Sequence, residues 1–425
     1  MDADGPTDPV TLELPVLYVV WPCDKPFPAD MDYEVLYDVF LPQAPTASQK
    51  AQGLSAEALH VLESMAIDTI RHTGDIGRYP SGIISCYDNY LNKYVPLVYL
   101  TVRFSLGSNI YEVKTDYNGY FSFKDPIFDN AVLSFVFDGL DGWKITSGGS
   151  SATIIESRGT YKSLRGSSIR DFDIQVNSSS VPDPRYEIYR AVGFYFYGLR
   201  TSYGSSSLLH LPEIDRFVDS TTGGMRIEAH TAAIQEGEGV FKSFLGNAHY
   251  IKIGNVNRNN HPRLMGTILH EMGHYTQFWI HRGYNHYNDI PKLLKESWAS
   301  YAGWYMGELY YSVQRLLPIP FEDDITRQAR QSWHPAMANP YYYYSPLFVD
   351  LRDNYNQCER LNNSRYANDA IKNVPYSLIN KLARESSWTG VKKVLREHIS
   401  SGYYTETQLN DFLVQWDKYF AANPL

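Results

Sequence analysis

The chain has few cysteines, fewer basic than acidic residues, and no long apolar segment. Its 425 residues include three cysteines, Cys23, Cys86 and Cys358, which are too few and too far apart for a disulfide scaffold. The formal net charge of −9 argues against a basic surface for nucleic acid or for an anionic membrane. No apolar run approaches the roughly 18–20 residues that a membrane span needs. A globular enzyme or an adhesin of two or three domains remains.

The start of the chain lacks the basic and apolar segments of a signal peptide. Two interpretations follow: a cytoplasmic protein, or an exported protein whose leader is absent from this chain. The 35 tyrosines and the acidic first residues favour export. We therefore expect an extracellular, periplasmic or cell-surface protein, with a cytoplasmic protein as the alternative.

Hydrophobic periodicity divides the chain into three parts. Residues 1–94 contain a predicted strand at 11–21 and a predicted amphipathic helix at 55–71. Residues 95–180 show short aromatic-rich strands separated by Asn-Gly, Asp-Gly and Gly-Gly, which predicts an antiparallel β-sandwich. Helical patterns dominate residues 181–425. Near the C-terminus helices are expected at about 346–356, 376–385, 388–400 and 406–421. The predicted fold class is multidomain α+β, a β-sandwich region followed by a mainly helical domain with a small sheet.

The segment 115–123, with the sequence TDYNGYFSF, resembles a hairpin of the carboxypeptidase-regulatory-like, transthyretin-like sandwich domains. The resemblance covers the strand-rich region alone. It implies an accessory domain with a structural or binding role, so the chemistry is expected elsewhere in the chain.

Histidines concentrate in one predicted helix and the loops around it. Of 12 histidines, six lie between residues 249 and 286, and two of these belong to the sequence HEMGH. In a helix, His270 and His274 lie on one face and can offer two imidazole nitrogens to one cation. Glu271 is rotated by about 100° from His270 and can act on a water molecule beside that cation. An accidental H-E-x-x-H is the alternative, because five residues alone are only moderately specific.

A catalytic zinc needs three protein ligands and one open position. The metzincin extension requires Gly at 277 and His at 280, where this chain has Gln277 and Ile280, so that class is excluded. His281 and His286 follow the motif, and each suits only an unusual ligand geometry. The third ligand is therefore sought further along the chain.

A second predicted helix begins near Pro291 and carries Glu296, 22 positions after His274. Residues 296–299, ESWA, match the E-x-x-A sequence of gluzincin metallopeptidases. HEMGH and ESWA together resemble the gluzincins, and the resemblance implies Zn²⁺ held by the two histidines and this glutamate. Small residues are expected to let the two helices approach closely, namely Gly273, Ala299, Ala302 and Gly303.

The resemblance implies a zinc metallopeptidase. Glu271 would act as the general base that takes a proton from the attacking water and delivers it to the leaving amine. Gluzincins approach the oxyanion with a downstream tyrosine or histidine, for which Tyr344 and Tyr343 are the first choices and His334 the second. Ser300 stands where many family members have an aspartate that orients a ligand histidine. That partner is therefore unidentified in this chain.

The predicted substrate follows from the same resemblance, and the other partner expectations follow from charge and hydropathy. The strand at 248–254, AHYIKIG, resembles the edge strand along which gluzincins bind peptide by strand addition. We expect a peptide, protein or glycoprotein substrate, no nucleic acid, no membrane span, and a monomer. HEMGHYTQ with a later glutamate also resembles the mucin-acting peptidases. The alternative from another class is a glycoprotein-binding or adhesion protein with a structural or impaired zinc site, against which Glu271 argues because a structural site needs no base.

Overall fold

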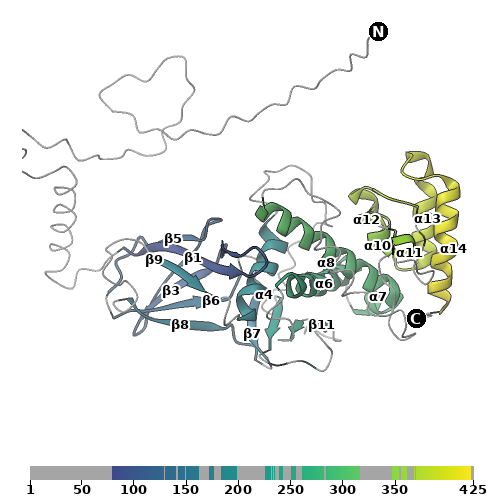
Figure 1. Ribbon diagram of the computed structural model, residues 1–425. Helices are drawn as coiled ribbons and strands as arrows, with labels where there is room; N and C mark the ends of the chain where they lie inside the picture. The colour runs from purple at the N-terminus through teal and green to yellow at the C-terminus, as the bar shows by residue number, and fades with distance from the viewer. Residues whose placement is uncertain are drawn as a thin grey trace, which may run out of the picture. The chain divides into compact units, whose positions relative to one another are not determined.

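In the computed structural model, the described residues lie between 79 and 422 (Figure 1). Within that span the segments left out are 129, 140–141, 149, 162–171, 177–182, 199–224, 231, 233, 235–238, 243–249, 255–260, 282–283, 316–346, 354–355, 361–367 and 369. All described residues belong to one compact unit, Asp75–Leu425. The expected strand at 11–21, the expected helix at 55–71, Cys23, His334, Tyr343 and Tyr344 lie outside the described residues.

Two four-stranded sheets form from the strand-rich region. The first contains β1 (Ser81–Asp88), β2 (Lys93–Pro96), β5 (Tyr120–Ser122) and β9 (Phe172–Val176), with β1 paired to the other three. The second has the order β4 (Asn109–Lys114), β3 (Thr101–Leu106), β6 (Val132–Val136) and β8 (Ile155–Thr160). Aromatic rings join the two sheets: Phe104 lies 5.2 Å from Phe123, and Tyr161 lies 5.5 Å from Phe172, between ring centroids. This shared aromatic core holds the sheets together.

The turn expected within 115–123 forms, but its flanking strands do not make a hairpin. The Asp116 carboxylate accepts hydrogen bonds from the backbone N–H groups of Asn118 and Tyr120, and Gly119 adopts a φ of 75°. The strand before the turn, β4, joins one sheet, while β5 after it joins the other. The local turn chemistry was thus predictable, whereas the pairing partners are set by distant strands.

A third sheet links the strand-rich region to the helices. Its order is β11 (Gly239–Lys242), β12 (Tyr250–Ile253), β10 (Arg226–Ala229) and β7 (Lys144–Ser147), with β7 and β10 parallel. The predicted domain limits at 95 and 180 do not coincide with the sheets, because β1 begins at Ser81 and β7 pairs with strands of the second half. The expectation that 248–254 is an edge strand was wrong. β12 pairs on both sides, and among the described strands β11 and β7 are the two edges of this sheet.

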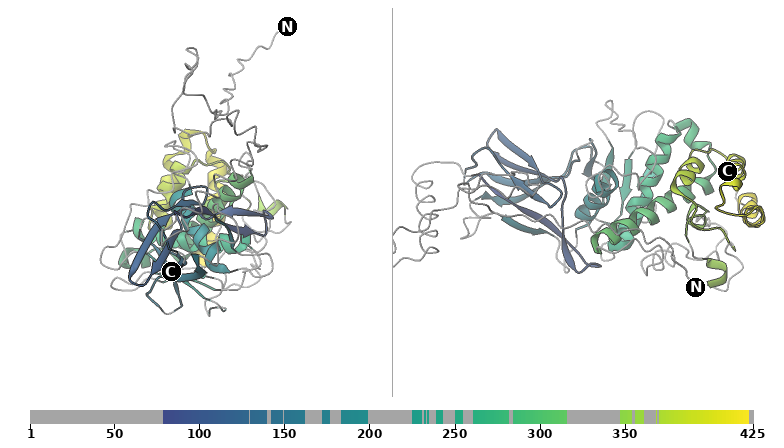
Figure 2. Two further views of the ribbon diagram at one scale, coloured as in Figure 1. Left: turned by 90° about the vertical axis from the view of Figure 1, so that its left-hand side faces the viewer. Right: turned by 90° about the horizontal axis from the view of Figure 1, so that it is seen from above.

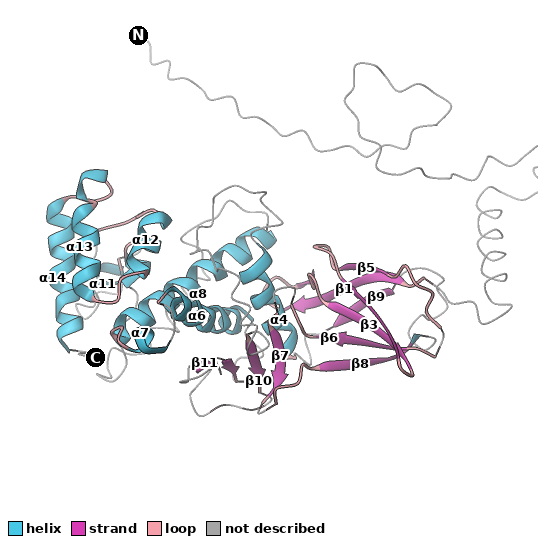
Figure 3. Cartoon of the chain, turned by 180° about the vertical axis from the view of Figure 1, so that it is seen from behind, coloured by secondary structure: helices cyan, strands magenta, loops and turns pink. Residues whose placement is uncertain are grey.

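The first of the described helices is α4 (Pro184–Gly193), which continues as a π-helical turn η1 (Phe194–Gly198). Asp183 caps α4 by accepting a hydrogen bond from the Arg185 backbone N–H at 2.9 Å. Two long helices follow, α6 (His261–Ile280) and α8 (Lys292–Arg315), joined through the short α7 (Tyr284–Asn288). Figures 2 and 3 show α6 and α8 side by side, and α6 also packs against α4 and β11.

Three of the four expected C-terminal helices form, at 376–385, 388–400 and 406–421, whereas the helix expected at 346–356 is reduced to the single turn of α10. The described C-terminal helices are α10 (Leu347–Asp350), α11 (Gln357–Arg360), α12 (Tyr376–Ala383), α13 (Trp388–Glu397), the 3-10 turn η2 (Ile399–Ser401) and α14 (Glu406–Ala422). Thr405 and Gln408 exchange hydrogen bonds at the start of α14, with the Gln408 side chain accepting at 2.9 Å and the Thr405 hydroxyl at 3.2 Å. The fold is therefore mixed α and β with several small sheets. Among the described helices, none combines the length and apolarity required to cross a bilayer.

Candidate metal centre

Helices α6 and α8 bring the three predicted ligands together. His270 and His274 lie one turn apart on α6, and Glu296 faces them from the first half of α8. The Glu296 Oε2 atom lies 3.3 Å from His270 Nε2 and 3.5 Å from His274 Nε2. One ligand atom from each of the three residues falls within 4.8 Å of the others. The three side chains predicted as ligands therefore lie close enough together to hold one metal ion.

Small residues at the helix crossing make this meeting possible. A Cβ added at Gly273 would lie 2.8 Å from the Ala299 Cα and 2.9 Å from the Ala302 Cβ. A Cβ added at Gly303 would lie 2.9 Å from the Gly266 carbonyl oxygen. All three distances are shorter than real Cβ contacts, so the helix backbones touch at the level of the ligands. The expected close approach is confirmed.

The ligand separations suit a metal ion as well as the long hydrogen bonds that the two imidazoles make to Glu296. An N–H···O hydrogen bond is usually about 2.7–3.2 Å long, and the Glu296 oxygen lies beyond this range from both imidazoles. In a tetrahedral site with zinc–ligand bonds of about 2.0–2.1 Å, adjacent ligand atoms are about 3.3 Å apart. The measured separations of 3.3 and 3.5 Å match that edge length. The side chains present therefore fit Zn²⁺.

The charge state of Glu296 supports the same conclusion. Burial alone would raise the pKa of Glu296, but the imidazoles of His274 and His270 hold it well below its usual range. The carboxylate is therefore ionised at neutral pH, as a ligand must be. The exposed fractions of the side chains are 12% for His270, 10% for His274 and 28% for Glu296. Solvent reaches the cluster mainly from the Glu296 side.

Glu271 sits behind the ligands in a drier environment. Its side chain is buried against the edge strand β11, where a Cβ at Gly239 would come within 3.0 Å of the Glu271 Cγ atom. Burial raises the pKa of Glu271 to about 7, with the His270 charge opposing the rise and the Glu296 carboxylate adding to it. The backbone N–H of Phe241 on β11 donates a hydrogen bond to the carboxylate. A carboxyl group with a pKa near neutrality is suited to accept and return a proton.

Tyr287 is the residue near the site that the sequence did not indicate. It lies on α7, and its hydroxyl is 3.1 Å from the Nδ1 atom of His274. Burial, followed by the charges of Glu296 and Glu271, raises the pKa of Tyr287 well above its usual value, so the hydroxyl is neutral. With 35 tyrosines in the chain, no sequence signal singled this one out. Ser300, where an aspartate was sought, is half-buried on α8.

The other predicted residues fall into two groups. His281 is turned away from the cluster, because its Nε2–H donates to the Ala383 carbonyl oxygen at 3.0 Å, and burial lowers its pKa. His286 is exposed on α7. Neither contributes to the ligand set. Tyr344, Tyr343 and His334 lie outside the described residues, so the oxyanion partner stays a prediction.

A second cluster of ligand-type residues lies at the start of α6. Asp88, Glu187 and His261 also bring one ligand atom each within 4.8 Å of the others, and all three are buried. The guanidinium of Arg190 occupies this cluster, with Nη2 2.6 Å from Asp88 Oδ2 and 2.6 Å from Glu187 Oε2. The protein itself supplies the cation here, so we interpret the cluster as a buried ion-pair network and not as a metal site.

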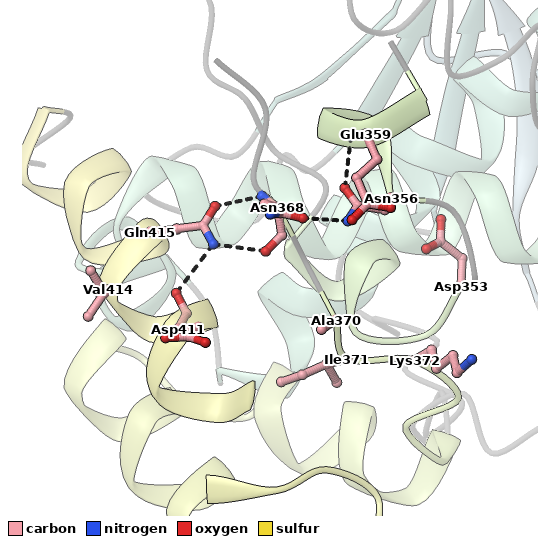
Figure 4. A pocket seen from close by; sticks show the side chains of 10 residues that line it. All are labelled: Asp353, Asn356, Glu359, Asn368, Ala370, Ile371, Lys372, Asp411, Val414 and Gln415. Carbon is pink, nitrogen blue, oxygen red and sulfur yellow. Dashed lines mark hydrogen bonds between the residues drawn. The ribbon is translucent and has the colours of Figure 1, made fainter. Parts of the chain in front are cut away.

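A pocket of about 620 Å³ opens between the C-terminal helices (Figure 4). Its lining contains Asp353, Asn356, Glu359, Asn368, Ala370, Ile371, Lys372, Asp411, Val414 and Gln415. The amides are paired with each other and with the backbone: Asn356 Nδ2 donates to Asn368 Oδ1 at 2.6 Å, and Gln415 Nε2 donates to the Asn368 carbonyl oxygen at 2.8 Å. These ten residues include no histidine, cysteine, serine or threonine. The pocket lining therefore offers no hydroxyl or thiol nucleophile and no imidazole ligand.

No protein-family model, curated protein or solved structure matches this chain. The gluzincin and transthyretin-like resemblances therefore rest on short motifs, and the functional argument rests on the geometry of the site.

Proposed function

We propose that the protein is a zinc-dependent peptidase. The observation that carries the proposal is the placement of the Glu296 carboxylate at 3.3 and 3.5 Å from the two imidazoles of H-E-x-x-H, with Glu271 buried beside them. When bound by these three ligands, Zn²⁺ would supply Lewis acidity and lower the pKa of a coordinated water. We further propose that α6 and α8 belong to a gluzincin-like catalytic domain, and that the strand-rich region is an accessory sandwich.

Glu271 is the residue that moves the proton. Its pKa near 7 lets the carboxylate take a proton from the attacking water and return it to the leaving amine within one turnover. The Phe241 backbone N–H fixes the carboxylate, and the close approach of Gly239 keeps one side of it dry. A purely structural metal site would not need a buried carboxyl group tuned in this way.

The edge strand β11 provides a place for the substrate backbone. It pairs with β12 on one side, its residues are half-buried, and it carries both Gly239 and Phe241 against Glu271. An extended peptide that paired with β11 would therefore run past the base and the ligands. Strand addition uses the backbone groups of the substrate, so a peptide, a protein or a glycoprotein could each bind in this way.

The test compares wild-type protein with Glu271→Gln, both purified without chelators. We expect one zinc per wild-type chain, cleavage of a peptide and glycopeptide library, and loss of cleavage after zinc removal with recovery on zinc addition. Glu271→Gln should keep the zinc, melt no lower than wild type, and lose cleavage. Glu397→Gln, at an exposed glutamate on α13, is the matched control and should cleave normally.

Two outcomes would contradict the proposal. Full cleavage by Glu271→Gln would remove the base from the mechanism. A wild-type chain that holds zinc but cleaves neither peptides nor glycopeptides would favour the glycoprotein-binding or adhesion alternative.

A further inference from the structure

We infer that Tyr287 is the positioning residue for the metal ligand His274, an inference that rests on the proposed zinc site. The hydroxyl of Tyr287 lies 3.1 Å from His274 Nδ1, while Nε2 of the same ring faces Glu296. The two ring nitrogens thus have separate tasks: one meets the phenol and the other faces the metal position. A hydrogen bond to the outer nitrogen decides which nitrogen has a lone pair for a metal.

A tyrosine hydroxyl suits both states of this ring because it can donate and accept. Without metal, the His274 Nε2–H points toward Glu296, and the Tyr287 O–H donates to Nδ1. With metal, Nε2 must present its lone pair, so the proton resides on Nδ1 and the Nδ1–H donates to the phenol oxygen. No net proton is gained or lost by the ring, since its proton moves from Nε2 to Nδ1 through solvent exchange. Tyr287 therefore keeps a hydrogen bond to the outer nitrogen in either tautomer, including the one that binds metal, and so holds the ring in place.

The surroundings hold the phenol in this position. Tyr287 is 6% exposed, and its ring packs against Phe278 of α6 and Phe241 of β11, with ring centroids 5.6 and 6.0 Å apart. Lys295 Nζ lies 5.1 Å from the centre of the same ring. Phe241 is also the residue whose backbone N–H bonds to Glu271. The base and the second ligand are thus positioned by two residues that touch each other.

Tyr287 also supplies a hydrogen-bond partner for a ligand histidine in a chain that has Ser300 at the position of the gluzincin-type aspartate. The gluzincin-type aspartate would come from α8, four residues after the ligand glutamate. Here the hydrogen bond to a ligand histidine comes instead from α7, in the connection between the two ligand helices. A phenol accepts a weaker hydrogen bond than a carboxylate does, so we expect a moderately held metal.

The test is zinc affinity measured by chelator competition for wild type, Tyr287→Phe, Tyr195→Phe and Glu296→Ala. Tyr195 is a matched control, since it is a buried tyrosine whose hydroxyl bonds to Thr276, on the same helix as His274 but not a ligand. We expect Tyr287→Phe to weaken zinc binding by about 10–100-fold, as for other outer partners of metal ligands, and Tyr195→Phe to leave it unchanged. Metal-free melting temperatures show whether either variant is merely unfolded.

A spectroscopic readout separates positioning from general packing. With Co²⁺ in place of zinc, Tyr287→Phe should alter the visible absorption bands, because the ligand ring is free to turn, whereas Tyr195→Phe should reproduce the wild-type spectrum. Unchanged zinc affinity and an unchanged cobalt spectrum in Tyr287→Phe would overturn the inference. If Glu296→Ala keeps full zinc affinity, the proposed zinc site itself fails, so the two failures are distinguishable.

Discussion

Helix α6 contributes to two clusters of histidine and carboxylate side chains that differ in what balances their negative charge. At its start, His261 joins Asp88 and Glu187 around the guanidinium of Arg190. Further along, His270 and His274 surround one carboxylate, from Glu296. Both clusters bring three ligand-type atoms within 4.8 Å of each other. Residue type and proximity are therefore not sufficient to recognise a metal site.

The cation in the first cluster explains its different character. Two buried carboxylates would be costly without a counter-charge, and Arg190 supplies one in direct contact with both. In the second cluster the partners of the carboxylate are imidazoles, which metals bind in their neutral form. Glu296 also keeps 28% of its side chain exposed, against 0% for Asp88 and 1% for Glu187. The second cluster has the charge balance and the access that an external cation requires.

The largest expected effect is on zinc binding. Glu296→Ala and His270→Ala each remove a ligand and should weaken zinc binding by more than the roughly 10–100-fold typical of outer partners. His261→Ala, in the buried cluster around Arg190, should leave zinc affinity unchanged while lowering the free energy of unfolding. Competition with a chromophoric chelator measures the affinities. Loss of zinc from His261→Ala with the ligands intact would show that both clusters belong to one site.

The next effect concerns what the buried cluster around Arg190 contributes to the stability of the protein. Arg190→Met leaves Asp88 and Glu187 buried without their cation, so the free energy of unfolding should fall by about 3–5 kcal/mol. Urea unfolding of the metal-free protein measures the change. Lys393→Met removes an exposed ion pair on α13 and should change the free energy of unfolding by less than about 1 kcal/mol. A similarly small effect of Arg190→Met would contradict the charge-balance explanation.

A third difference should appear in the pH dependence of the metal-free protein. Because the folded pKa of Glu271, about 7, lies above the unfolded value of 4.5, its contribution to stability is fully present below pH 4.5 and is lost as the pH rises through 7. The loss amounts to about 3 kcal/mol at most. Glu271→Gln should flatten the wild-type curve between pH 4.5 and 7, as measured by urea unfolding at several pH values.

Other groups do not obscure this comparison. The raised pKa of Glu187 affects the stability of wild type and of Glu271→Gln equally. Its contribution therefore cancels when the two stability curves are compared. The depressed pKa of Glu296 places its contribution above pH 4.5, to be lost only as the pH falls further. Identical slopes for wild type and Glu271→Gln would mean that the carboxyl group titrates normally.

The smallest effect is expected at the helix crossing. Gly273→Ala places a Cβ 2.8 Å from the Ala299 Cα, which should lower the free energy of unfolding by about 1–3 kcal/mol and weaken zinc binding by separating the ligands. Gly307→Ala on α8 has open space around the new Cβ and should stabilise by about 0.5–1 kcal/mol. Thermal unfolding and zinc titration measure both. Equal behaviour of the two variants would show that close approach is not required.

Much of the site could be predicted because its determinants are local. Four-residue spacing fixes the relation of His270 to His274 once the helix forms, and small residues identify the face where α8 approaches. The reciprocal hydrogen bonds between Thr405 and Gln408 were predictable for the same reason, since both residues lie within one helical turn. In these cases the number of residues between two side chains is enough to predict that they meet.

The remaining features depend on residues that meet only in the tertiary structure. Asp88 at the end of β1 and Arg190 on α4, 102 positions apart, meet as an ion pair that no periodicity indicates. β12 lies inside the sheet because it pairs with β10 on one side and β11 on the other, and these pairings join strands far apart in the chain. Tyr287 is distinguished from the other tyrosines by its position on a short helix between two long ones. Such contacts have no signature in a single sequence.

The connection between α6 and α8 has a consequence for anyone who transplants this centre into another scaffold. A graft that copied the two ligand helices and joined them by a generic flexible linker would reproduce the coordinating atoms and omit α7. The imidazole of His274 would then lack the phenol that contacts its outer nitrogen. Any graft must therefore include the continuous segment 261–315 and not the two helices alone, because the peptide between them carries Tyr287.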